Sequence, residues 1–123
     1  MFIGERREQQ SAVAYATQAD AAAAVLRDAR LSTVAALATG RFFDLAAVET
    51  RVDVLYGELS ETRPPALFAD YHTHLLGEAR HLRSSISAAR NGRHNEAQQE
   101  INAANREQEA RLQAAEAIIS GAE

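Results

Sequence analysis

Residues 36–46, ALATGRFFDLA, determine the architecture of this chain, because they have the pattern of a tight turn between two antiparallel helices. An alanine-rich helix end is followed by Gly40, and glycine readily takes the left-handed conformation that closes a helix C-terminus. Asp44 and Leu45 then supply the acidic and apolar residues that open a following helix. Residues 87–97, SAARNGRHNEA, repeat this pattern around Gly92, 52 residues further along the chain. The two turns predict two helical hairpins.

The dipeptide Pro64-Pro65 lies between the two turns and marks the junction of the hairpins. A residue before proline is disfavoured in helical geometry, whereas proline suits the first turn of a helix. We therefore expect one helix to end before Arg63 and the next to begin at Pro65. The length is typical of one domain, and we expect residues 1–123 to form a single all-α domain. Its predicted fold is an antiparallel four-helix bundle of two hairpins, at about residues 5–61 and 65–120.

Apolar residues at steps of three and four positions support this assignment. The expected helices run from about Glu5 or Ser11 to Ala38, from Asp44 to Ser60, from Pro65 to Arg90 and from Asn95 to Ser120. The clearest core stripe belongs to the second helix: Leu45, Val48, Val52, Leu55 and Leu59. The stripe expected in the last helix includes one polar residue: Ala97, Ile101, Ala104, Gln108, Leu112, Ala115 and Ile119. We expect Gln108 either at the edge of this stripe or bonded across the bundle, where it would fix the register.

Charge and hydropathy narrow the function classes. The chain has a formal net charge of −4, and its 13 basic residues are all arginines spread along the sequence, which disfavours nucleic-acid binding. The absence of cysteine removes thiolate chemistry. No apolar run approaches the roughly 20 residues of a membrane span, so we expect a soluble chain that does not insert into a membrane. Its default location is the cytoplasm, with the cell envelope as the alternative if Phe2-Ile3-Gly4 is the remainder of an anchor.

The third helix concentrates the groups suited to metal or proton chemistry. His74, Glu78 and His81 stand at i, i+4 and i+7, which places them on one flank of the helix. This spacing suits zinc if another helix adds a ligand. A small-molecule or metal-binding bundle would use these three residues together with Tyr71. The alternative is that they are half-exposed residues at the edge of the core stripe, which form ordinary surface pairs.

The sequence carries no catalytic signature. Ser84 and Ser85 follow His81, but no G-x-S-x-G turn surrounds them, and the six glycines form no phosphate-binding loop. We therefore expect no enzymatic activity and no cofactor; an enzyme would need a carboxylate pair that meets the histidines across the core. Gly57 and Gly77 fall inside helices, where either close packing against a neighbour or a tolerated weakness would explain them.

The first helix is the best candidate for a partner surface, because its some 30 residues span about 45 Å and the second helix spans only about 26 Å. The N-terminal half of this helix presents a face of mostly small residues: Ala12, Tyr15, Ala16, Ala19, Ala22 and Ala23. This face either packs on the third and fourth helices of its own chain or docks on another protein, as in a homodimer. We therefore predict a non-enzymatic interaction or structural module, with a small-molecule or metal-binding bundle as the alternative.

Three segments together carry a resemblance to a known group of proteins. They are Arg63-Pro64-Pro65 with the following Tyr71-His72, the turn Ala88-Ala89-Arg90-Asn91-Gly92, and the alanine-rich last helix. Over about residues 20–120, the chain resembles uncharacterised two-hairpin helical domains of bacterial envelope proteins and lipoproteins. The resemblance suggests a bacterial origin and an envelope location, and it implies no catalytic residue.

Overall fold

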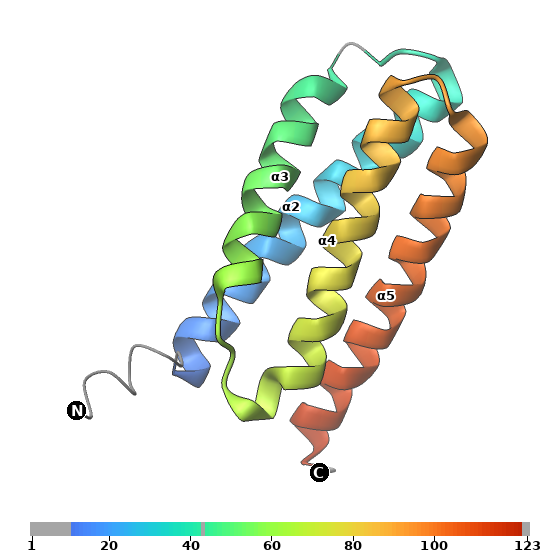
Figure 1. The fold of residues 1–123 in the computed structure, drawn as a ribbon. Helices are drawn as coiled ribbons and strands as arrows, with labels where there is room; N and C mark the ends of the chain where they lie inside the picture. Colours follow the sequence, from blue (N-terminus) through green and yellow to red (C-terminus); the bar gives the residue numbers. More distant parts are fainter. Residues whose placement is uncertain (1–10, 43, 122–123) are drawn as a thin grey trace.

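The computed structural model describes residues 11–42 and 44–121, and within them the chain is helical throughout apart from its turns. Its elements are α2 (Ala12–Thr39), α3 (Leu45–Glu61), the 3-10 turn η1 (Ala66–Phe68), α4 (Ala69–Arg90) and α5 (His94–Ser120). The four α-helices run alternately up and down, so that the start of α2 and the end of α5 lie at the same end of the molecule (Figure 1). The predicted all-α four-helix bundle is confirmed.

The helix ends lie close to the predicted ones, for local reasons. The Ser11 hydroxyl accepts a hydrogen bond from the Ala14 amide at 3.1 Å and caps α2. The alternative start at Glu5 and the apolar Phe2-Ile3-Gly4 lie outside the described residues. Gly40 and Gly92 have φ values of +73° and +77°, the left-handed conformation that a side chain would strain.

The third predicted helix begins differently from the prediction. Pro65 is extended, with φ −57° and ψ 151°, and its carbonyl accepts a hydrogen bond from the Phe68 amide at 2.9 Å. The chain therefore makes one 3-10 turn before the regular helix starts at Ala69. This short turn places Phe68 at the end of the bundle that holds the start of α2 and the end of α5.

The core follows the predicted stripe of α3, whose five large aliphatic residues are all buried: Leu45, Val48, Val52, Leu55 and Leu59. α4 is the central helix, because it packs against α2, α3 and α5, whereas α2 and α5 are not a closely packed pair. None of the helices in residues 11–42 and 44–121 combines the length and apolar character that crossing a membrane requires.

The predicted core stripe of α5 is wrong at Leu112 and Ile119, whereas Ala115 packs against the core as predicted. Leu112 and Ile119 are 52% and 85% exposed, whereas Arg111 is buried and Ile118 packs against the core. The inward-facing positions therefore continue from the half-buried Gln108 through Arg111, Ala115 and Ile118, in alternating steps of three and four. Arg111 can be buried at this position because it pairs with the buried carboxylate of Glu78 on α4.

Candidate functional site

A charged cluster ties three helices together inside the bundle. Glu78 on α4 is 0% exposed, and its carboxylate lies between two guanidinium groups. One oxygen accepts a hydrogen bond from Arg30 of α2, and the other accepts from Nε of Arg111 of α5 at 2.9 Å. Glu78 was predicted as a half-exposed residue or a metal ligand; burial between two arginines gives it a structural role instead.

Arg111 also binds an aromatic residue. Its Nη1 donates to the hydroxyl of Tyr71 at 3.0 Å, and its guanidinium carbon lies 5.6 Å from the centre of the Tyr71 ring. Burial lowers the pKa of Arg111, but attraction to Glu78 and interaction with Tyr71 raise it by more, so the net shift is upward. Arg111 therefore stays charged and holds the Tyr71 hydroxyl at a fixed position.

A second buried contact joins α2 to α4. Nε2 of His72 lies 3.0 Å from the carbonyl oxygen of Leu59, so Nε2 donates. Nδ1 is then the acceptor, and the Tyr15 hydroxyl donates to it at 2.8 Å. Burial lowers the pKa of His72, although the Leu59 carbonyl opposes this shift. Burial also raises the pKa of Tyr15, so both side chains stay neutral near pH 7.

The structure separates the three residues predicted to bind a metal. His74 pairs with Glu107 and His81 pairs with Glu100, each through Nδ1 at 2.7 Å, while Glu78 turns inward to the arginines. Throughout residues 11–42 and 44–121, no group of three or more His, Cys, Asp or Glu is placed to hold a metal ion. The three side chains predicted to lie together on one flank are therefore separated. Glu78 lies in the core, and His74 and His81 make separate contacts with α5.

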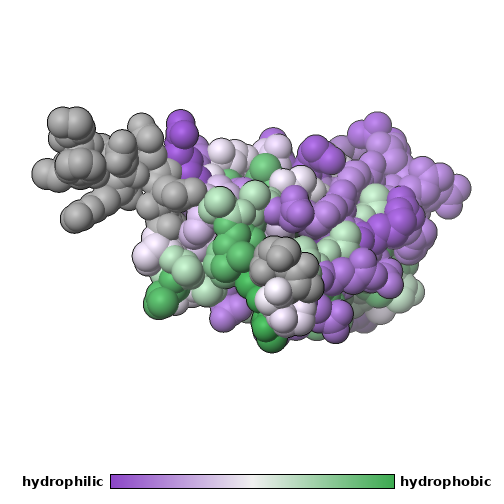
Figure 2. Space-filling view, turned by 90° about the horizontal axis from the view of Figure 1, so that it is seen from below, coloured by the Kyte–Doolittle hydropathy of each residue, from purple (hydrophilic) through white to green (hydrophobic). Residues whose placement is uncertain are grey.

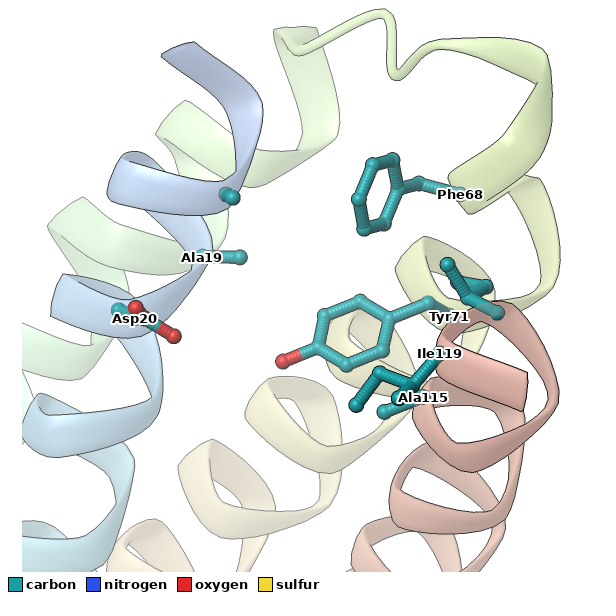
Figure 3. Close-up of a pocket in the computed structure, with 8 residues that line it drawn as sticks. Ala19, Asp20, Phe68, Tyr71, Ala115 and Ile119 are labelled. Atoms are coloured by element: carbon teal, nitrogen blue, oxygen red, sulfur yellow. The ribbon is translucent and has the colours of Figure 1, made fainter. Parts of the chain in front are cut away.

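The strongest candidate for a binding surface is an open apolar groove at the end of the bundle where α2 begins and α5 ends. We call it the α2–α5 groove; it has a volume of about 210 Å³. Its lining residues are Ala16, Ala19, Asp20, Phe68, Tyr71, Ala115, Ile118 and Ile119. Ala19 and Asp20 form one wall, Ala115 and Ile119 form the other, and the rings of Phe68 and Tyr71 project between them (Figure 3). Apolar side chains gather in a band on this end of the molecule, whereas one side of the same view is mostly hydrophilic (Figure 2).

The groove exists because its two walls are built from small residues and its helices do not pack closely. Alanine at positions 16, 19 and 115 leaves space that a larger side chain would fill. Apart from the Asp20 carboxylate and the Tyr71 hydroxyl, the lining side chains are apolar, and that hydroxyl is already bound by Arg111. The arrangement suits an apolar side chain supplied from outside.

The predicted partner surface on the first helix needs correction. Tyr15, Ala19 and Ala22 are buried against the protein's own core, because the N-terminal half of α2 packs inside the bundle. Of the other three predicted residues, Ala12 is exposed, Ala16 and Ala23 are half-buried, and Ala16 lines the groove. The small-residue face therefore serves mainly intramolecular packing, and it contributes Ala16 and Ala19 to the lining of the groove.

Sequence reasoning missed the other parts of the groove. Tyr71 was predicted as a binding residue only together with His74, Glu78 and His81, and Phe68 and Ile118 were not singled out. A usable signal was the pair Ile118-Ile119, because adjacent positions of a helix point about 100° apart and cannot both face one core. Comparisons of the chain with protein-family models, with curated proteins and with solved structures find no match. The resemblance to helical domains of bacterial envelope proteins accordingly stays a prediction.

Proposed function

We propose that this chain is a non-enzymatic helical interaction module, which receives apolar side chains of a partner in the α2–α5 groove. One observation carries the proposal: the groove is open and almost entirely apolar, and Ile119 on its wall is 85% exposed. Contiguous exposed apolar surface of this kind is typical of sites that bind other molecules. Val13, one turn before Ala16 on α2, adds a further exposed aliphatic residue near the same wall.

The size of the groove favours side chains over a whole small molecule. Pockets for drug-sized ligands are roughly 300–1,000 Å³, and this groove has a volume of about 210 Å³. It holds one or two large apolar side chains, such as those on the edge of a helix. Fully burying one isoleucine contributes about 1.5–3 kcal/mol, so the groove alone supports weak, reversible association.

A neutral probe of side-chain size tests whether the groove is open. Indole, the ring system of tryptophan, is titrated into the uniformly labelled chain while amide shifts are followed by NMR. The proposal expects shift changes concentrated on the residues that line the groove, with weak affinity. An Ala16→Leu variant should lose these changes, because the added side chain fills the groove from within.

Ala21→Leu is the matched control, because Ala21 is exposed on the same helix and outside the groove. This variant should respond to indole as the wild type does. Absent shift changes, or changes confined to residues far from the groove, would contradict the proposal.

A further inference from the structure

The surroundings of the α2–α5 groove are acidic. Asp20 lies in the groove wall, and Glu116 is exposed on α5, where it lines a shallow surface hollow together with Ile119. Asp70 is exposed at the start of α4, one residue before Tyr71. The chain has 13 arginines, yet none occurs in residues 12–26, 66–79 or 112–121, which supply the walls and floor of the groove. The apolar groove thus has one carboxylate, Asp20, in its α2 wall and another, Glu116, beside its α5 wall.

This combination points to the chemistry of the partner. We propose that the groove binds a basic amphipathic helix, an inference that rests on the interaction function proposed above. The apolar side chains of that helix would enter between α2 and α5, and arginine or lysine residues beside them would meet Asp20 and Glu116. Helix-in-groove recognition uses such an apolar stripe, and complementary charge guides the encounter and excludes other partners.

The same charges argue against a second copy of this chain as the occupant. A two-fold pairing brings identical surfaces together, so the acidic walls of one copy would face those of the other. Like charges at such close range disfavour association. In the described parts of α2 and α5, the nearest arginines beyond the groove are Arg27 and Arg111, and Arg111 is already bound to Glu78. Arg27 pairs with the adjacent Asp28, so neither of these two arginines is a free basic partner for the groove.

Three matched peptides of about 18 residues, or five helical turns, test the proposal. All carry the same leucine face, and their polar faces are built from lysine, glutamine or glutamate. Binding to the full chain is followed by fluorescence anisotropy of labelled peptide at about 0.1 M and about 0.5 M salt. We expect the lysine peptide to bind at least about 10-fold more tightly than the glutamate peptide, with the difference shrinking at high salt.

Charge-neutralising variants locate the effect. Asp20→Asn and Glu116→Gln should each weaken binding of the lysine peptide by about 2- to 5-fold. Asp28→Asn changes the net charge equally but lies on an exposed position of α2 outside the groove, so it should have less effect. Ala16→Leu should weaken all three peptides, whereas Ala21→Leu should not.

The outcomes separate this inference from the function on which it rests. Equal binding of the three peptides, abolished by Ala16→Leu, would overturn the basic partner and keep the interaction module. No binding of any peptide, with no response to indole, would overturn both. Light scattering that reports a dimer, dissociated by the Ala16→Leu substitution but not by Ala21→Leu, would assign the groove to a second copy and also overturn the basic partner.

Discussion

The Tyr15 hydroxyl donates to Nδ1 of His72 at 2.8 Å, and this contact fixes the start of α2 against α4. His72 can accept this bond because its other ring nitrogen donates to the carbonyl of Leu59 on α3. One imidazole ring thus joins three helices at the end of the bundle that carries the groove. The position of the groove wall on α2 depends on this pair.

Tyr15→Phe should destabilise the protein by about 1–3 kcal/mol, because it leaves the buried Nδ1 of His72 without a donor. The ring itself remains and keeps its contacts with Phe68 and Tyr71. Urea denaturation followed by circular dichroism measures the change. Tyr56→Phe is the control: Tyr56 is half-buried, and no hydrogen bond of its hydroxyl occurs among the described residues, so its loss should matter little. Equal effects of the two substitutions would show that the Tyr15–His72 bond contributes nothing.

His72 should make stability fall on mild acidification. Burial lowers the pKa of His72 below its ordinary value of 6.5, so the unfolded chain takes up the proton first as the pH falls. The contribution of neutral His72 is therefore complete above that value and is lost as the pH decreases through it toward the folded-state pKa. We therefore expect this group to reduce the stability of the folded protein between about pH 7.5 and pH 5.5.

A His72→Gln variant isolates this effect in urea titrations at both pH values. Glutamine keeps a donor and an acceptor but does not titrate in this range. The variant should be less stable than the wild type at the higher pH, and it should lose less stability on acidification. The remaining histidines are common to both proteins and cancel in the comparison. An identical pH dependence of wild type and variant would refute the assigned role of His72.

Glu78→Gln should be strongly destabilising, by about 3–5 kcal/mol, because it removes the buried negative charge that the half-buried Arg30 and the buried Arg111 share. Glutamine has nearly the same shape, so the effect measures charge more than packing. The measurement is the urea midpoint, or loss of the cooperative transition if the variant no longer folds. Asp53→Asn removes the charge that Arg83 contacts at 2.8 Å on the surface, and it should cost no more than about 1 kcal/mol. A Glu78→Gln variant as stable as Asp53→Asn would contradict the structure of the cluster.

The two glycines inside helices should respond differently to alanine. A side chain added at Gly57 meets no atom within 4 Å, so Gly57→Ala should gain about 0.5–1 kcal/mol from reduced freedom of the unfolded chain. At Gly77 the new Cβ would lie 2.9 Å from the Glu107 carboxyl carbon, and Glu107 would move away from His74. Gly77→Ala should therefore gain nothing or lose stability. Thermal unfolding measures which of the two variants is more stable. A Gly77→Ala variant more stable than Gly57→Ala would contradict the packing of α4 on α5.

The glycines also show how far sequence reasoning reached. Both explanations predicted for a glycine inside a helix occur: close packing at Gly77 and open space at Gly57. The sequence pattern is the same in the two places, because glycine spacing records no information about which helix lies opposite. Likewise, the i, i+4, i+7 spacing placed His74, Glu78 and His81 on one flank. It carried no information about the arginines on α2 and α5 that draw Glu78 inward.

The sequence by itself determined the all-α class, the four helices, the turns at Gly40 and Gly92, and the buried stripe of α3. These features depend on interactions within about four residues along the chain, and such interactions leave a periodic pattern. Only the tertiary structure decided the Tyr15–His72 bond, the burial of Arg111 in place of Leu112, and the groove. Each of these depends on how far one helix is rotated against another. The groove in particular combines residues from three separate segments, 16–20, 68–71 and 115–119, which only the packing of the helices brings together.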